Sequence, residues 1–354
     1  MADIQLYNNL KIKSKFGEYK VTFTKKKIFF NNLKNSLYII DKNIFRLYKK
    51  SFLNLHNILL INPKEENKSF EKMGEYLSLF QKKKVNKKST VICIGGGITQ
   101  DITSFICSIY FRGIKWHFYP TTLLAQADSC IGSKNSINFN KGKNLIGCFY
   151  PPEKIVINFS FLKTLKNKEI SSGIGEILKC GIIDNSNKFI KFKKRYINLI
   201  SKKNNLNKFI KESLSIKKKI IEIDEFDKKE RKIMNYGHTF GHALESECAY
   251  KIPHGIAVNI GMDFANFLSS RLGYINKTKF IKLNNILIKN FEKFKNYKPD
   301  INIFCKYLTN DKKNSKKNYI NAILLHENKL KVTSIKIDEI LKTILNDYFF
   351  KLNK

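Results

Sequence analysis

The residues best suited to chemistry form a group of histidines in the second half of the chain. His238 and His242 lie four residues apart in NYGHTFGHALE, so on a helix they share one face. His254 follows Pro253, which places three of the chain's six histidines within 17 positions. A histidine pair alone is more often structural. The third imidazole and the carboxylate of Glu176, in SSGIGEILKCG, favour a site of the zinc type with one position open for substrate.

A run of glycines after an apolar stretch is a second candidate. Gly95, Gly96 and Gly97 follow VICI, and Asp101 comes shortly after them. Consecutive glycines at the carboxyl end of a strand let backbone N–H groups approach a pyrophosphate, and a following helix N-terminus favours its negative charge. A tight strand-to-helix turn without any ligand is an almost equally good interpretation.

The segment DSCIGSKNSINFNKGKN is a third candidate. It offers Asp128, Lys134, Lys143 and Asn144 among small residues. Such a loop can bind a phosphate or a carboxylate through its cationic and amide groups. In so lysine-rich a chain, a solvent-exposed basic loop is the more common explanation.

The elements that must position these residues change character along the chain. Apolar β-rich runs at 36–41, 57–62, 89–97 and 114–120 predict strands, and 70–84 between them has helical spacing. Strands that alternate with helices imply a parallel sheet with crossover connections. The stretches 172–183, 186–223 and 231–272 are typical of helices. The sequence predicts an α/β domain over residues 1–160 and a mainly α-helical domain over 161–354, with an Asp/Lys-rich loop at 309–318.

Length and composition limit the class of protein. The 354 residues are 43% hydrophobic and 13% aromatic, which excludes a disordered chain and suggests about two domains. No apolar run is long enough for a membrane helix, and the first 20 residues lack the order of a secretory signal. Seven cysteines without a C-x-x-C pair argue against a disulfide framework. We expect an intracellular, cytoplasmic protein with reduced thiols and no membrane partner.

The net charge of +37 raises the question of a nucleic-acid partner. Only five of the 66 basic residues are arginine, the residue that makes bidentate phosphate and base contacts. Lysine is spread along the whole chain, which indicates a general bias in amino-acid composition in a protein of ordinary fold. We therefore expect solvated lysines and no nucleic-acid partner. A local basic pocket that binds a phosphorylated metabolite remains an alternative.

Several of these segments, taken in order, resemble the 3-dehydroquinate synthase family. The stretches that carry the resemblance are GGGITQD at 95–101, YFRGIKWHFYPTTLLAQADSCIGSKNSINFNKGKNLIGCFYPP at 110–152, SSGIGEILKCG at 171–181, RKIMNYGHTFGHALE with IPHGIAVNIGM at 231–262, and more weakly PKEENKSF at 63–70.

The resemblance implies a Rossmann-like NAD-binding domain followed by a helical, metal-binding domain. It also implies the family's reaction, which converts 3-deoxy-arabino-heptulosonate 7-phosphate to 3-dehydroquinate and phosphate. In that reaction NAD⁺ oxidises a ring hydroxyl, phosphate leaves by elimination, the hydride returns, and an intramolecular aldol step closes the ring.

The resemblance assigns roles to residues one by one. Glu176, His238 and His254 are implied as ligands of a divalent metal, zinc or cobalt. His242 is implied in a proton relay near the leaving phosphate, contrary to the pairing by helical spacing. Arg112 is implied to reach across from a neighbouring subunit, so the resemblance also predicts a homodimer. The remaining residues implied to bind or orient the substrate are Asp128, Lys134, Asn144, Lys179, Lys217, Arg231, Asn235 and Lys312.

The family's cofactor contacts fall mainly in the first half of the chain. They correspond here to Asp41, Glu65, Lys68, Gly96, Gly97, Asp101, Thr121, Thr122 and Lys143.

Four positions depart from the family's pattern. Lys64, Gln100 and Ser133 stand where the family usually has glycine, and Gly175 stands where it usually has alanine. None of the four is an implied metal ligand or charged substrate contact. Three other interpretations stay open: a different sugar-phosphate cyclase, a metal-dependent alcohol dehydrogenase of similar architecture, and a polyanion-binding protein.

Overall fold

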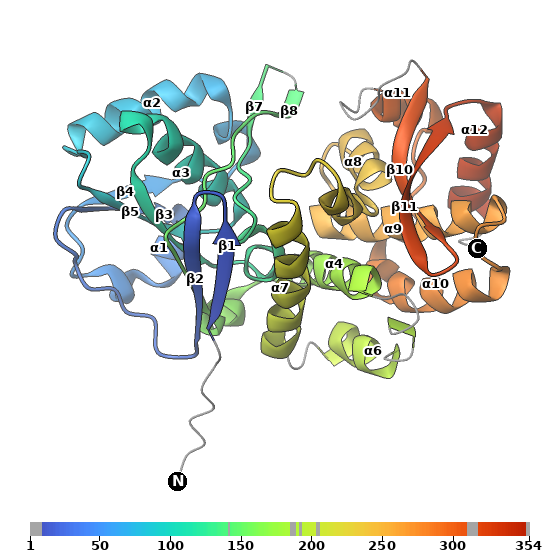
Figure 1. The fold of residues 1–354 in the computed structure, drawn as a ribbon, viewed down its shortest axis with the longest axis horizontal. Coiled ribbons are helices and arrows are strands. Elements are labelled where there is room, and N and C mark those ends of the chain that lie inside the picture. Colours follow the sequence, from blue (N-terminus) through green and yellow to red (C-terminus); the bar gives the residue numbers. More distant parts are fainter. Residues whose placement is uncertain are drawn as a thin grey trace, which may run out of the picture. The chain divides into compact units, whose positions relative to one another are not determined.

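The computed structural model describes residues 9–140, 142–184, 189–190, 193–202, 206–309 and 318–351. The chain divides into two compact units (Figure 1). The first comprises 1–166 with 217–226, and the second comprises 167–216 with 227–354. The predicted domain boundary at residue 160 stays a prediction.

The first unit is built on a seven-stranded sheet with the order β1-β2-β9-β6-β5-β3-β4, in which β9 is Lys154–Asn158. All neighbouring strands are parallel except β1 (Leu10–Ser14) and β2 (Gly17–Thr24), which form an antiparallel pair. The four predicted strands are confirmed as β3 (Ser36–Asp41), β4 (Ile58–Ile61), β5 (Thr90–Gly95) and β6 (Lys115–Pro120). All six residues of β3 are buried, as expected for a central parallel strand.

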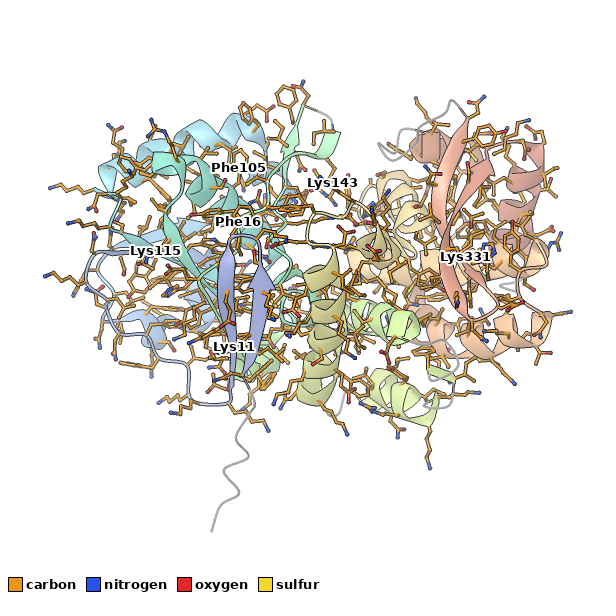
Figure 2. All side chains as sticks on the ribbon, viewed as in Figure 1. Lys11, Phe16, Phe105, Lys115, Lys143 and Lys331 are labelled. Carbon is orange, nitrogen blue, oxygen red and sulfur yellow. The ribbon has the colours of Figure 1, made fainter. Side chains whose placement is uncertain are left out.

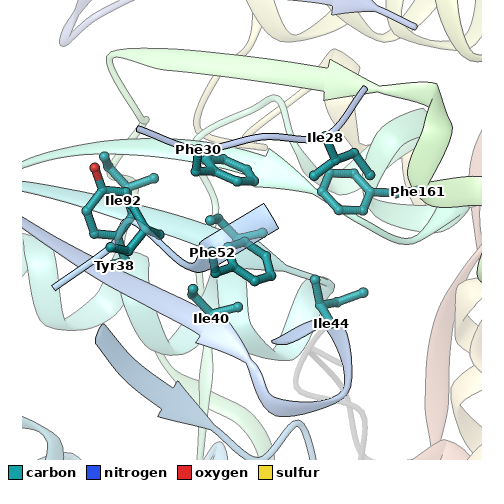
Figure 3. Packing of buried hydrophobic residues seen from close by; sticks show 10 residues of the cluster. Ile28, Phe30, Tyr38, Ile40, Ile44, Phe52, Ile92 and Phe161 are labelled. Atoms are coloured by element: carbon teal, nitrogen blue, oxygen red, sulfur yellow. The ribbon is translucent and has the colours of Figure 1, made fainter. Parts of the chain in front are cut away.

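Helices connect these strands and cover the sheet. They are α1 (Lys42–Leu47), α2 (Phe70–Lys82) and α3 (Gly97–Ile109). The predicted strand at 89–97 ends earlier than expected because Gly97 already begins α3. An apolar cluster packs β3 and β5 against α1, two 3₁₀ helices and the segment around Ile28 and Phe30 (Figure 3). Its members are Ile28, Phe30, Tyr38, Ile40, Ile44, Phe52, Leu55, Ile92, Ile94 and Phe161.

The strand order reverses at β3. From β3 the chain passes outward to β4, then returns to place β5 and β6 on the other side. In open α/β sheets, ligands bind at the carboxyl ends of the strands where the order reverses. The topology therefore marks the ends of β3 and β5, at Asp41 and Gly95, as the place for a ligand.

Sequence periodicity missed several strands of the first unit. The basic segment after residue 128 contains a short antiparallel hairpin of β7 (Ile137–Phe139) and β8 (Gly142–Ile146), and β9 (Lys154–Asn158) enters the sheet between β2 and β6. Lysines cover the exposed surface of both units, for example Lys115 and Lys331 (Figure 2).

The second unit is mainly helical. Its helices are α4 (Asn167–Asp184), α6 (Lys193–Lys202), α7 (Leu206–Ile223, of which 217–223 belong to the first unit), the 3₁₀ helix η6 (Glu230–Asn235), α8 (His238–Glu247), α9 (His254–Arg271), α10 (Lys277–Phe291), α11 (Ile301–Thr309) and α12 (Glu339–Asn346).

The helical half is more broken than predicted. The stretch 231–272 is three separate helices, because Gly237 adopts the left-handed region with φ 78° and Pro253 precedes α9. An antiparallel hairpin of β10 (Tyr319–His326) and β11 (Lys329–Lys336) also lies in this half. The predicted loop at 309–318 lies outside the described residues for 310–317. No helix in the described ranges is long and apolar enough to cross a membrane. All seven cysteines are described, and none forms a disulfide.

The buried helix α9 carries a carboxyl group whose ionisation should cost stability. Asp263 Oδ2 accepts hydrogen bonds of 2.8 Å from Asn284 Nδ2 and from the Tyr348 hydroxyl. Burial raises the pKa of Asp263 to about 6 from 3.8, although both hydrogen bonds act to lower it. The folded state therefore holds the proton more tightly than the unfolded chain, and stability falls as the pH rises from 4 to 6.

We expect Asp263→Asn to remove this pH dependence. The free energy of unfolding of the variant, minus that of the parent, should rise by about 2.4 kcal/mol between pH 4 and pH 7 and change little above. Urea unfolding at a series of pH values measures the difference, and the exposed Glu66→Gln is the control. A difference that does not change with pH would contradict the role of Asp263.

Candidate functional site

The second unit brings a carboxylate and two imidazoles together from three helices. Glu176 lies on α4, His238 begins α8 and His254 begins α9. Glu176 Oε1 is 3.8 Å from His238 Nε2 and 3.5 Å from His254 Nε2. The left-handed residue before α8 and the proline before α9 start both helices at a histidine, so both rings lie at helix N-termini.

Hydrogen bonds on the far side of each ring orient it. His254 Nδ1 is 2.9 Å from Glu245 Oε2, and His238 Nδ1 is 3.3 Å from the Tyr236 carbonyl oxygen. With the proton on Nδ1, each Nε2 presents its lone pair towards Glu176. Metal-binding histidines are held in this way. Glu245 lies within the quoted GHALE segment, yet sequence reasoning gave it no role, because its contact with His254 spans a turn between two helices.

The Glu176 carboxylate fits a cation. It is 99% buried, Lys179 Nζ lies 2.5 Å from Oε2 as an ion pair, and Oε1 faces the two imidazole rings. A buried carboxylate is costly unless positive charge compensates it; Lys179 supplies this charge at Oε2, and a cation between Oε1 and the rings would supply it at Oε1. Two imidazole nitrogens and one carboxylate oxygen form a donor set that divalent zinc accepts. These residues therefore fit the implied metal.

His242 also lies at this cluster. Its ring centroid is 5.2 Å from that of His238 and 5.6 Å from that of His254. One ligand atom from each of these three histidines lies within 4.8 Å of the others. Two donor sets therefore share His238 and His254: one is completed by Glu176 and the other by His242. The assignment of His242 as a residue that does not bind metal stays a prediction.

The cluster attracts positive charge. Burial opposes the charged form of His254, but the carboxylates of Glu245 and Glu176 outweigh burial and raise the pKa of this ring to about 10. The same negative potential that retains a proton here also favours a divalent cation.

Two glycines explain how α4 and α9 approach closely enough to place Glu176 beside His254. A Cβ at Gly175 would lie 2.0 Å from the carbonyl oxygen of Gly255, and a Cβ at Gly255 would lie 1.9 Å from that of Ser172. The helices cross backbone to backbone here, and the Gly255 amide donates to Ser172 Oγ at 2.9 Å. The departure at Gly175 thus has a structural reason in this chain.

In the first unit, eight of the nine residues implied as cofactor contacts lie at or shortly after the carboxyl ends of β3, β4, β5 and β6, and the ninth, Lys143, lies on β8. A Cβ at Gly96 would lie 2.9 Å from Thr122 Cγ2, whereas a Cβ at Gly97 would meet no atom within 4 Å. No side chain caps the N-terminus of α3, and the buried Thr121 Oγ1 has no hydrogen-bond partner among the described residues. An open helix N-terminus beside an unsatisfied hydroxyl fits a dinucleotide phosphate.

Lys68 joins cofactor and substrate candidates. Its Nζ donates hydrogen bonds of 2.8 Å to Asp101 Oδ2 and to Asn144 Oδ1, and lies 3.7 Å from Glu65 Oε1. Burial alone would lower the pKa of Lys68, but the two carboxylates outweigh it and raise the pKa. Lys143, on β8, directly precedes Asn144.

The remaining substrate candidates are divided between the first and the second unit. In the first unit, Lys217 Nζ contacts Asp128 Oδ1 at 2.5 Å, and the exposed Lys134 lies over the Phe149 ring at 5.9 Å. Arg112 is exposed on a turn. In the second unit, η6 carries the buried Arg231 and also Asn235, which faces a cavity of about 210 Å³. Lys312 lies outside the described residues.

The overall fold is similar to that of solved structures. A solved 2-deoxy-scyllo-inosose synthase, complexed with carbaglucose-6-phosphate, NAD⁺ and Co²⁺, superposes with a TM-score of 0.81 over 96% of this chain and 100% of its own, at 22% identity. This similarity shows the fold.

The sequence comparisons give the family. The sequence pattern of the 3-dehydroquinate synthase N-terminal domain matches residues 58–172, and that of the C-terminal domain matches 173–314. The 3-dehydroquinate synthase of Dictyoglomus turgidum is 40% identical over 72% of this chain and 73% of its own. That of Clostridium tetani is 35% identical over 86% of this chain and 84% of its own. The chain belongs to the 3-dehydroquinate synthase family.

Proposed function

We infer that this chain is a 3-dehydroquinate synthase, a lyase that converts 3-deoxy-arabino-heptulosonate 7-phosphate to 3-dehydroquinate and phosphate with NAD as a recycled oxidant. The observation that carries the inference is the cluster of Glu176, His238 and His254, in a chain whose two halves match the two domains of the family.

Each unit contributes one kind of chemistry. A divalent ion held by Glu176, His238 and His254 would supply positive charge beside the substrate hydroxyls and lower their pKa. NAD held at the carboxyl ends of β3–β6 would supply a hydride acceptor that is restored within each turnover. Glu245 orients the His254 ring, and Lys179 balances the buried charge of Glu176.

Charged and polar side chains among the implied substrate contacts suit an anionic substrate. Lys134, Asn144 and Arg112 bind the phosphate, and His242 holds a proton at its imidazole for the leaving group. The buried guanidinium of Arg231 suits a carboxylate, because its planar donors match two oxygens at once. The other substrate contacts in this proposal are Asp128, Lys217, Asn235 and Lys312.

The proposal extends to assembly and location. Arg112 lies exposed on a turn in which both Phe111 and Arg112 have positive φ. A side chain held outward in this way suits a contribution to the site of a second copy, so we propose a homodimer in the cytoplasm. Sedimentation of the purified chain measures its oligomeric state. In the homodimer, Arg112→Ala should lower turnover.

The first experiment measures phosphate release from 3-deoxy-arabino-heptulosonate 7-phosphate with catalytic NAD⁺, before and after chelation. We expect metal-dependent release, formation of 3-dehydroquinate and no net NADH at 340 nm. Accumulation of NADH would indicate an alcohol dehydrogenase instead. If the folded, metal-loaded chain releases no phosphate from this substrate but does so from another phosphosugar, it is a different cyclase.

Lys134→Ala should cripple turnover while NAD still binds, because Lys134 supplies a charge for the phosphate and lies outside the predicted cofactor contacts. We expect kcat/KM to fall by about a hundredfold or more, the scale typical of a lost transition-state charge contact. Steady-state kinetics and calorimetric titration with NAD measure the two effects. The exposed Lys88→Ala is the matched control. Parental kinetics in Lys134→Ala would refute the assignment.

A further inference from the structure

The 125–134 segment, which carries Asp128 and Lys134, has an unusual backbone. Ala125–Ser129 forms a π-helix turn, and Ser133 has a φ of 66°. A π turn and a left-handed serine are both less stable than regular structure and persist where surrounding contacts hold them. Two side chains of the first unit supply those contacts.

Gln100 holds one end of the segment. It lies on α3 and is 95% buried. Its Nε2 donates to the Ser129 carbonyl oxygen at 2.8 Å, and Ser129 Oγ donates back to Gln100 Oε1 at 2.7 Å. The amide group therefore uses both its donor and its acceptor on a single residue, the neighbour of Asp128. This position is one of those at which the chain departs from the family's glycine.

Ser133 holds the other end. Its hydroxyl donates to Glu225 Oε1 at 2.5 Å, and the same carboxylate accepts from Ser14 Oγ and from the Lys15 amide, both at 2.7 Å. Glu225 is buried, so these hydrogen bonds are charge-assisted and shielded from water. Ser133 directly precedes Lys134, and it too stands at a position where the family usually has glycine.

A glycine at either position would remove the contact. At 133, glycine would adopt the positive φ without strain but would offer no hydroxyl to Glu225. At 100, it would leave the Ser129 carbonyl and hydroxyl without these hydrogen bonds. In this chain the two side chains therefore make contacts that the backbone alone does not supply.

We propose that Gln100 and Ser133 are positioning residues that fix Asp128 and Lys134 in the geometry needed for the substrate. They act from two directions: Gln100 from α3, and Ser133 through Glu225 in the 217–226 part of the unit. The proposal rests on the function inferred above, because it assumes that Asp128 and Lys134 contact the substrate.

The test compares Gln100→Ala and Ser133→Ala with matched controls on α2. The controls are Gln81→Ala and Ser78→Ala, because Gln81 is exposed and the Ser78 hydroxyl bonds only locally, to the Gly74 carbonyl. We expect kcat/KM for the phosphosugar to fall by about thirtyfold in both test variants, since misplacing a catalytic group by about 1 Å can cost a hundredfold. The affinity for NAD should change less than the kinetics do.

Ser133→Gly separates positioning from folding. Glycine adopts the positive φ without strain, which offsets part of the loss of the hydroxyl, so the protein should stay folded and still lose activity. A role in folding alone would instead make activity follow stability. Should Gln100→Ala fail to fold, Ser133→Gly decides the question alone, and parental kinetics in that variant overturn the proposal.

Amide hydrogen exchange gives a readout that does not depend on activity. The Gly132 amide donates to the Tyr19 hydroxyl at 3.0 Å, and the Lys134 amide donates to the Gly132 carbonyl at 2.8 Å. Both should exchange about tenfold faster in Ser133→Gly, since local opening becomes easier. If the parent releases no phosphate but the exchange accelerates, the proposed function fails while the anchoring stands. Unchanged exchange overturns the anchoring.

Discussion

His238→Ala should yield a folded protein without bound zinc and with turnover at least about a thousandfold lower, because a metal charge at the reacting hydroxyls is worth several kcal/mol. The imidazole of His238 is one of two whose Nε2 atoms face Glu176. Metal analysis of the purified variant, alongside phosphate release, measures both effects. The exposed His56→Ala is the matched control and should keep full metal and activity.

The companion variant His242→Ala decides between the two donor sets. If Glu176 completes the site, His242→Ala keeps its zinc and loses turnover through the proton relay alone. If the three histidines hold the ion, His242→Ala loses zinc as His238→Ala does. A His238→Ala protein with full zinc would refute both sets, since both contain this residue.

Gly255→Ala should destabilise the helical unit by about 3 kcal/mol or more, because overpacking a rigid backbone contact exceeds the usual cost of an added methyl group. The new Cβ would lie 1.9 Å from the Ser172 carbonyl oxygen, so α4 and α9 must move apart. Since His254 directly precedes Gly255, that movement should also separate His254 from Glu176 and weaken metal binding. Urea unfolding and metal titration measure the two losses.

Gly74→Ala is the control for this experiment. Gly74 is an exposed residue of α2, and a Cβ there would meet no atom within 4 Å. The substitution should stabilise the protein by about 0.5–1 kcal/mol through helix propensity alone. A Gly255→Ala protein as stable as Gly74→Ala, with undiminished metal affinity, would contradict the importance of the close crossing.

Local sequence patterns predicted the parts of the fold that depend on local periodicity. The strands β3 to β6 are apolar runs flanked by turn residues, and α2 has helical spacing, so all five elements were predicted with small errors at their ends. The β7–β8 and β10–β11 hairpins were not predicted. The two strands of the first hairpin have three and five residues and lie in a polar, lysine-rich segment. Strands this short show too little alternation of apolar and polar residues to be detected.

Local spacing could suggest the metal cluster but could not assemble it. The i,i+4 pair of His238 and His242 is visible in the sequence, whereas the approach of Glu176 depends on the glycine crossing of α4 and α9. The partners of Gln100 and Ser133 are equally distant along the chain: Ser129 lies 29 residues away and Glu225 lies 92 residues away. No local pattern encodes such contacts: the family resemblance implied that Glu176 belongs to the metal cluster, whereas the contacts of Gln100 and Ser133 became visible only in the structure.

The first unit is formed from two separate segments of the chain, which limits how the protein can be divided into fragments or exchanged by recombination. Lys217 and Glu225 belong to the first unit and bind Asp128 and Ser133 there, yet the chain reaches them only after passing through residues 167–216 of the second unit. A gene cut once, near residue 166, would produce an N-terminal fragment that lacks Lys217 and Glu225. The C-terminal fragment would contain these two residues without the Asp128 and Ser133 that they bind. Recombination with a single crossover therefore cannot exchange the sheet unit as a module, and the two halves are expected to pass between lineages together.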